Sequence, residues 1–330
     1  MIDFIKIKVT DAKVIQHFWQ HHLLYMHSNS EKLLYDNEVI KEVQKKQYKN
    51  VIFEFTHYAL YIHFKPHYYY NNNLHNANDF SVLDCINTLI EFTKNFNVNL
   101  KCLQIINIEF GFNVVIPKEL KCVKELLIYM IYHCRNPFYT NNKYLHCRFS
   151  HSIDRHGKAN VYKMIKAYSK GVQYPMFTDE NTFRFEVKSN RKEYINRLGI
   201  YTLHDLLNPN IYNILTQTLL KEFDDVLIID DEAKPNLSGT KLNNHHKKLN
   251  PIYWCKLLNK SQNAFRRNIK AYNDALNTCD THLKKDVRKL IFDKLLDLKM
   301  CAYLTIYKDK TSTLLIPEEL CEKKSLSYQL

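Results

Sequence analysis

Glycine is scarce in this sequence: only five of the 330 residues are glycine, at positions 111, 157, 171, 199 and 239. No two of them are close enough to form a GxGxxG turn or a Walker loop, the glycine-rich turns that hold nucleotide phosphates. This scarcity excludes a P-loop ATPase and a Rossmann dehydrogenase.

Paired cysteines and long apolar runs are also missing. None of the nine cysteines forms a CxxC pair, and their number is odd. The sequence therefore predicts reduced, mostly buried thiols rather than a zinc motif or a disulfide framework. The start, MIDFIKIKVTD, lacks the apolar core of a signal peptide, and no run approaches the length of a membrane span. We expect a cytoplasmic protein with no membrane partner.

Positive charge is abundant. The formal net charge is +13 and the pI is near 9.1. Residues 241–299 carry fourteen Lys and Arg against five Asp, which is most of the excess. Such a balance favours a polyanionic partner such as nucleic acid. The alternative is compositional, because the many Lys, Asn, Ile and Tyr residues are also what an AT-rich genome produces.

The segment KCLQIINIEFGFNVVI, residues 101–116, separates into two faces when read with the two-residue period of a strand. Asn107, Glu109, Gly111 and Asn113 share the polar face. The apolar face is continuous and predicts a strand at the centre of a sheet covered by helices. It comprises Ile106, Ile108, Phe110, Phe112, Val114 and Ile116. The alternative is an antiparallel strand with a solvated polar face.

Periodicity predicts a mixed architecture around this strand. A first strand includes Ile5, Ile7 and Val9, and an exposed loop covers residues 68–79. The further strands are expected at 51–55, 59–65, 143–149, 161–168 and 182–188. The helical segments are expected at 82–96, 118–133, 191–198, 202–207, 209–223 and, in a basic stretch, 251–300. Residues 224–250 read as a linker or an irregular hairpin.

Chemistry concentrates between Glu109 and Glu186. In VYKMIKAYSKGVQY, Tyr168 ends a strand, and Lys170 and Gly171 follow directly. A tyrosine in this position can present its hydroxyl at a sheet edge, and a nearby ammonium can stabilise phenolate or phosphate charge. The segment therefore holds a candidate nucleophile, although tyrosine is common in this chain.

The strand TFRFEVKSN supplies a second carboxylate. Glu186 alternates with Arg184 and Lys188 and would share a polar face with Glu109 if both strands lie in one sheet. Two carboxylates could hold a divalent cation that polarises a scissile phosphate, together with a histidine such as His156. His151 and His156 are better placed for this than the other histidines. The alternative is that Glu186 is a cross-strand ion-pair residue.

Four short motifs occur in a fixed order: NIEFGFN, KAYSKGVQY, FRFEVKSN and LGIYTLHDLL. Over roughly residues 100–230 this order resembles the replication initiators of rolling-circle plasmids and filamentous phages. It resembles more closely the phage and plasmid replication-type proteins of Bacteroidetes. The family often carries a second acid where this chain has Asn113, a weaker ligand for a hard cation.

The resemblance implies an endonuclease that nicks one DNA strand and remains joined to the 5′ phosphate. Tyr168 would be the nucleophile, Lys170 its electrostatic partner, and Glu109, Glu186 and His156 the ligands of Mg²⁺ or Mn²⁺. It implies DNA, single-stranded or as an origin duplex, as the main partner, and a host helicase or polymerase as further partners.

The sequence as a whole predicts an α+β fold whose antiparallel sheet has helices on one face and an open catalytic face on the other. We expect an initiator-like domain at 1–230, a linker or irregular hairpin at 231–250, and a basic helical DNA-binding region at 251–330. The cations expected to contact phosphates are Lys247, Lys248, Arg266, Arg267, Lys284, Lys285, Arg288 and Lys289. The alternatives are a non-catalytic DNA-binding protein of the same fold and a structural protein whose charge is only compositional.

Overall fold

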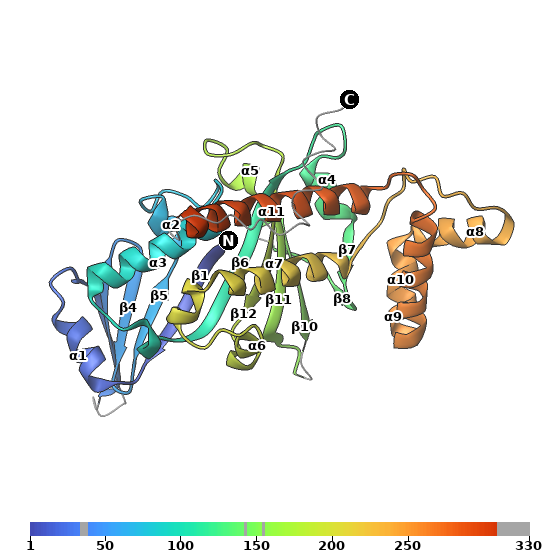
Figure 1. Cartoon of the computed structure of the whole chain (residues 1–330). Helices are drawn as coiled ribbons and strands as arrows, with labels where there is room; N and C mark the ends of the chain where they lie inside the picture. The colour runs from blue at the N-terminus through green and yellow to red at the C-terminus, as the bar shows by residue number, and fades with distance from the viewer. Residues whose placement is uncertain (34–38, 142–143, 154–155, 309–330) are drawn as a thin grey trace.

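The computed structural model of the chain describes residues 1–33, 39–141, 144–153 and 156–308 (Figure 1). Its main feature is a ten-stranded sheet in which all described neighbours pair antiparallel. The strands are β1 (Ile2–Val9), β2 (Tyr25–Leu33), β3 (Val39–Tyr48), β4 (Val51–Thr56), β5 (Leu60–Phe64), β6 (Gln104–Val115), β9 (Tyr139–Asn141), β10 (Tyr144–Ile153), β11 (Ala159–Ser169) and β12 (Thr182–Ser189).

The sheet order is β2-β3-β4-β5-β1-β6-β12-β11-β10-β9, so β6 lies near the centre, as predicted. A smaller three-stranded sheet has the order β13-β7-β8. Its strands are β7 (Met130–His133), β8 (Asn136–Pro137) and β13 (Val226–Ile228).

The helical elements confirm the α+β class. They are α1 (Ala12–Gln20), α2 (Pro66–Tyr70), α3 (Val82–Phe96), α4 (Val123–Tyr129), α5 (Lys170–Gln173), α6 (Lys192–Arg197), α7 (Pro209–Asp224), α8 (Gly239–Lys248), α9 (Pro251–Lys260), α10 (Gln262–Leu276), α11 (Leu283–Lys308) and the 3₁₀ turns η1 (Leu100–Cys102) and η2 (Leu203–Leu207). Local sequence sets several of their starts. Ser81 and Asp84 form a capping box at α3, and Pro209 opens α7 after Asn208, whose side chain caps the helix.

Three long helices, α3, α7 and α11, lie across one face of the large sheet (Figure 1). The main core fills the space between them, and the apolar side chains of β6 and β12, such as Phe110, Phe112 and Phe185, are fully buried there. The period-two alternation therefore leaves Glu109, Gly111 and Asn113 on the opposite face.

A second, smaller core lies beside the first. Trp254, Phe265, Tyr272 and Leu276 of α9 and α10 pack with residues of the three-stranded sheet. The two faces of that sheet belong to different cores, since Leu227 packs in the second core and its neighbours Val226 and Ile228 pack in the first. The three-stranded sheet thus connects the α8–α10 region to the rest of the fold.

The prediction of the apolar face of β6 is wrong at one residue, Ile106. The pairing of β1 with β6 shifts register between Lys6 and Ile7, so that Asn107 pairs with Lys6 and Ile105 pairs with Ile7. This irregularity brings Ile105 into the core in place of Ile106, which is only partly buried.

Three predicted boundaries differ from the structure. The expected helix at 118–133 is the short helix α4 followed by β7, and the expected linker contains α8. Helix α11 does not belong to a separate basic region, because its apolar side chains, including Val287 and Ile291, pack in the main core. Residues 309–330 of that predicted region lie outside the described residues.

The cysteines are less buried than predicted. Among the described thiols Cys85 and Cys147 are buried, whereas four are exposed: Cys102, Cys122, Cys134 and Cys255. No helix in the described part of the chain has the length and apolar character needed to span a membrane.

Candidate functional site

The candidate site is the polar face of the large sheet where β6, β12 and β11 run side by side. The register places Glu186 between Gly111 and Lys166, and Arg184 between Asn113 and Tyr168. Residues opposite one another across neighbouring strands share a face. The sheet therefore gathers three of the predicted residues, Tyr168, Glu109 and Glu186. It adds Arg184 and Lys166, to which the sequence assigned no role in the site.

Tyr168 and Glu186 form the central contact of this face. The Tyr168 hydroxyl donates a hydrogen bond of 2.6 Å to Oε1 of Glu186, and Nε of Arg184 donates to the same oxygen at 2.6 Å. Glu186 lies directly over Gly111, where a Cβ atom would come within 2.8 Å of Cγ of Glu186 and would also meet the Phe185 carbonyl. Only glycine at position 111 leaves room for this arrangement.

Arg184 is the hub of the buried charges, with only 2% of its surface exposed. Its guanidinium pairs with the buried carboxylate of Asp3 and with Glu186, and Nη1 donates to Oδ1 of Asn113 at 2.8 Å. Asn113 in turn donates to the carbonyl of Ala77 at 2.9 Å. The amide that the sequence marked as a weak metal ligand therefore ties Arg184 to the 76–78 loop.

Burial and charge set the protonation of the central pair. Burial and then the Glu186 carboxylate raise the pKa of Tyr168 well above its ordinary value, so its hydroxyl is protonated at neutral pH. Burial opposes ionisation of Glu186, but Lys166 and then Arg184 outweigh it and hold the pKa of this carboxyl well below its usual range. Glu186 is thus an anionic acceptor of the hydrogen bond from Tyr168.

Lys170 lies beside this pair but not at the tyrosine hydroxyl. Its buried ammonium donates to Oδ1 of Asn76 at 2.6 Å and to Oε1 of Gln173 at 2.9 Å, and it lies 5.3 Å from the centre of the Tyr168 ring. Burial lowers the pKa of Lys170 to about 8. The predicted electrostatic partner therefore faces the ring of Tyr168 rather than its oxygen.

Lys166 bridges the two predicted metal ligands. Its ammonium lies 2.5 Å from Oε2 of Glu109 and 3.4 Å from Oε2 of Glu186. Lys188 lies 2.5 Å from the other oxygen of Glu109. The sequence correctly placed both carboxylates on one face, and the structure shows each of them in ion pairs.

His156 does not join these carboxylates. It lies in the turn of the β10–β11 hairpin, beyond the pair formed by Ile153 and Ala159. Lys166 is seven residues further along β11, which corresponds to about 23 Å of extended strand. The prediction that His156 ligates a metal together with Glu109 and Glu186 is therefore wrong.

Without His156, the two carboxylates Glu109 and Glu186 do not form a binding site for Mg²⁺ or Mn²⁺. Such cations need several oxygen ligands, and here both carboxylates are already neutralised by ammonium and guanidinium groups. No third acidic, histidine or cysteine side chain of the described residues completes a ligand cluster with Glu109 and Glu186. A cation would have to displace Lys166 from between them.

Removal of that lysine should create a cation site. In the Lys166→Met variant we expect Mn²⁺ affinity to rise at least about tenfold over the unchanged protein, because two neighbouring carboxylates lose their shared counter-charge. Manganese binding followed by electron paramagnetic resonance measures this. Lys49→Met is the matched control, since Lys49 pairs with Glu91, away from this face. Equal Mn²⁺ affinity in all three proteins would show that Lys166 does not occupy the cation position.

The eight predicted DNA-contacting cations do not form one surface. Lys248 is buried. Lys284 and Lys285 donate to backbone carbonyls, and Arg288 pairs with Asp224 at 2.6 Å. The four of these cations to which the structure gives neither an ion pair nor a side-chain hydrogen bond among the described residues are Lys247, Arg266, Arg267 and Lys289, all of them exposed.

Two described cavities lie elsewhere, among α3, η1, η2 and α7, with volumes of about 360 and 290 Å³. Both are lined by His204 and Leu207, and no residue of the Tyr168 network lines either of them. The polar face is therefore defined by its buried charges and not by a deep pocket.

Comparison with known proteins gives a distant structural likeness. No protein-family model matches the sequence, and no curated protein matches it. One similar solved structure is a rolling circle replication initiator protein from Geobacillus stearothermophilus, with a TM-score of 0.38 and 10% sequence identity, over 67% of this chain and 84% of that chain. The likeness is a distant structural one.

Proposed function

We propose that this chain nicks and rejoins one strand of DNA at a replication origin, with Tyr168 as the nucleophile. The observation that carries the proposal is the 2.6 Å hydrogen bond from the Tyr168 hydroxyl to Glu186, which Arg184 orients from the same side. A nucleophile, a base within hydrogen-bond reach and a third group that fixes the base are the usual parts of an activated nucleophile.

The proposed reaction transfers a phosphoryl group and needs no net input of energy. The Tyr168 oxygen forms a bond to a backbone phosphorus, and its proton passes to Glu186. The bond from phosphorus to the 3′ oxygen breaks, and that oxygen takes up a proton and leaves as a 3′ hydroxyl. The same hydroxyl can later attack the tyrosyl phosphate and rejoin the strand.

The cations of the face have two roles in this proposal. Lys166 and Arg184 hold Glu186 ionised, so that it accepts the hydrogen bond of Tyr168, and proton transfer to Glu186 requires these cations to shift toward the incoming phosphate. Positive charge next to the reacting phosphate would also stabilise the charge that develops in the transition state. Because the Tyr168 side chain is only 9% exposed, a DNA strand can reach its hydroxyl only after the side chains over it move.

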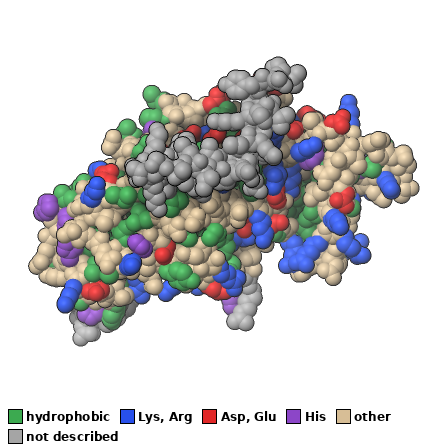
Figure 2. Space-filling view, viewed as in Figure 1, with side chains coloured by type: hydrophobic (Ala, Val, Ile, Leu, Met, Phe, Trp, Pro, Cys, Tyr) green, Lys and Arg blue, Asp and Glu red, His purple; other side chains and the backbone are tan. Residues whose placement is uncertain are grey.

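A second surface is suited to holding the DNA. Lys and Arg side chains gather at the lower end of the α9 and α10 pair (Figure 2). We define this α9–α10 tip as Lys256, Lys260, Arg266 and Arg267, all of which are exposed. Ser261 joins the two helices and caps α10, so the tip is a tight turn between helices rather than a loose loop. Clustered exposed cations on a rigid tip favour phosphate contacts.

Salt dependence tests this surface. Four phosphate contacts give a slope of about −3.6 for log affinity against log salt, at about −0.9 for each neutralised phosphate. Replacement of Arg266 and Arg267 by Gln should flatten the slope by about 1.8. The matched control removes the same charge at Lys284 and Arg288, which bind Asp224, and should leave the slope unchanged. Equal flattening by both double variants would refute a specific role for the tip.

A non-catalytic DNA-binding protein is the second candidate. The burial of Tyr168 and the ion pairs of Glu109 and Glu186 favour it, because a buried network of this kind also serves only to hold strands together. This alternative predicts the same salt dependence of DNA binding but no strand nicking.

The catalytic proposal also implies partners. A host polymerase extends the 3′ hydroxyl and a helicase opens the duplex.

Covalent capture separates the two candidates. We expect the full chain, incubated with an end-labelled single-stranded DNA library of random sequence, to form an adduct that survives a denaturing gel. The non-catalytic candidate gives retention on a native gel and no band on the denaturing gel. Absence of both the adduct on the denaturing gel and the retention on the native gel would favour a structural protein.

A further inference from the structure

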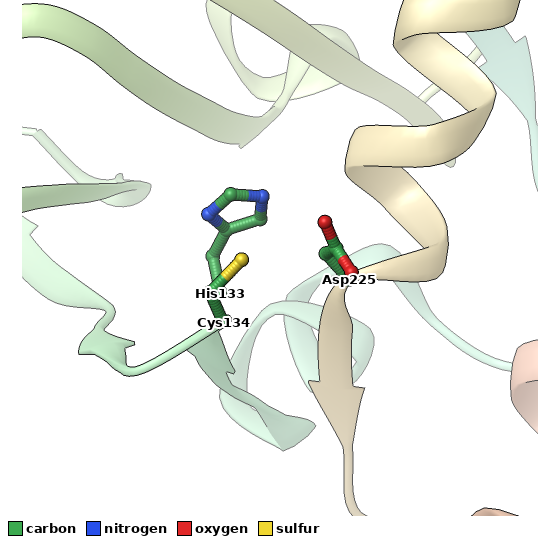
Figure 3. A group of neighbouring side chains, drawn as sticks. All are labelled: His133, Cys134 and Asp225. Carbon is green, nitrogen blue, oxygen red and sulfur yellow. The ribbon is translucent and has the colours of Figure 1, made fainter. Parts of the chain in front are cut away.

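A second group of side chains lies outside the Tyr168 network, at the edge of the three-stranded sheet. His133 ends β7, Cys134 follows it, and Asp225 connects α7 to β13. One ligand atom from each of the three lies within 4.8 Å of the other two. The imidazole and the thiol face the carboxylate across the gap between the two segments (Figure 3).

The backbone holds these residues together without any ion. Cys134 donates its N–H to the carbonyl of Asp225 at 2.9 Å, and His133 pairs with Val226 in the sheet. Cys134 has φ of 53°, a left-handed conformation that a residue with a side chain adopts only at a cost. The fold therefore presents three potential ligands at fixed positions.

His133 is the buried member, with 2% of its surface exposed. Its Nε2 lies 2.8 Å from Oε2 of Glu222 but is not aligned for a hydrogen bond there. Glu222 in turn is held by Lys163 at 2.7 Å. His133 thus has a contact with Glu222, and its imidazole must turn away from that carboxylate to bind an ion. Cys134 and Asp225 are exposed, so an ion can enter from solvent.

We propose that His133, Cys134 and Asp225 bind a zinc ion that fastens the three-stranded sheet between the two cores. Imidazole, thiolate and carboxylate are the ligand types that Zn²⁺ takes, at about 2.0–2.3 Å. Those bond lengths correspond to separations of roughly 3.3–3.8 Å between ligand atoms in a tetrahedron, so small side-chain rotations suffice. The fourth position is left for water. The ion joins β7 to the α7–β13 junction, where the two cores meet.

Cobalt substitution tests this site with a spectroscopic signal. The full-length, tag-free chain is stripped of metal and titrated with Co²⁺. We expect a 1:1 complex with a sulfur-to-cobalt charge-transfer band and tetrahedral d–d bands, and displacement of both by Zn²⁺. Cys134→Ser should lose the charge-transfer band, and its Zn²⁺ affinity should fall at least about 100-fold. Zn²⁺ should raise the melting temperature of the unchanged protein but not that of Cys134→Ser.

Two further variants serve as control and backup. Cys102→Ser removes another exposed thiol and should keep the band and the affinity. Asp225→Asn is a mild change at an exposed position and should weaken Zn²⁺ binding while keeping the sulfur band, even if Cys134→Ser fails to fold. Absence of the band in the unchanged protein would overturn the proposal. A charge-transfer band that persists in Cys134→Ser would also overturn it, and so would an unchanged Zn²⁺ affinity in Asp225→Asn.

Discussion

Tyr168→Phe should abolish the covalent DNA adduct and lower the nicking rate by at least about 10⁴-fold, the scale seen when a catalytic nucleophile is removed. The substitution takes away only the attacking oxygen. Glu186 keeps its hydrogen bond from Arg184, so the free energy of unfolding should fall by only about 1 kcal/mol. DNA affinity should stay nearly unchanged, because a phenyl ring fills the same space. Adduct yield on a denaturing gel and affinity by fluorescence anisotropy measure the two effects.

Two other tyrosines are controls for that variant. Tyr162 lies on the same strand and packs against Tyr194, and the hydroxyl of Tyr174 contacts that of Tyr68. Tyr162→Phe and Tyr174→Phe should each retain the adduct. An adduct that persists in Tyr168→Phe and disappears in one of these variants would move the nucleophile to that residue.

Arg184→Met should be the most destabilising substitution on the polar face, with a loss of about 3–5 kcal/mol in the free energy of unfolding. Removal of one partner of a buried ion pair leaves the other charge uncompensated. Here two buried carboxylates, Asp3 and Glu186, lose their guanidinium at once. Equilibrium unfolding in urea measures the loss.

The matched control is Lys188→Met, which removes a cation from the same strand and face. Lys188 is more exposed, and Glu109 keeps Lys166, so we expect a loss of about 1 kcal/mol or less. A second substitution, Asp3→Asn, should recover part of the Arg184→Met loss because it removes one of the uncompensated charges. Equal losses in the two single variants would contradict the role of Arg184 as the hub.

Alternation along the strands was the part of this fold that the sequence could predict. A central strand with one apolar face identified β6, and the same period placed Glu186 and Glu109 on a shared face. The register irregularity opposite Lys6 is a property of two paired strands, so nothing local to residues 105–107 indicated it. That is why Ile106 was assigned to the core in place of Ile105.

The partners of the charged side chains could not be predicted in this way. Lys166 meets Glu109 across two strand pairings, and Arg184 meets Asp3 from the first strand of the chain. Such contacts depend on which strands are neighbours, which the sequence leaves open. The same limitation led to the metal site with His156, a residue close to Tyr168 in sequence but at the far end of its strand.

Composition was a poor guide to the C-terminal helices. Helix α11 carries Lys284, Lys285, Arg288 and Lys289 and still packs its apolar stripe into the main core. Charge density alone did not distinguish a covering helix from a DNA-binding one, because both have a polar outer face.

The most direct test of the central claim is to map the residue that becomes joined to DNA. The adduct from the single-stranded library is digested with protease and nuclease, and the nucleotide-bearing peptide is sequenced by mass spectrometry. We expect a phosphotyrosine linkage at Tyr168 and at no other tyrosine. A linkage at a different residue, or binding of DNA with no adduct under any divalent-cation condition, would contradict it.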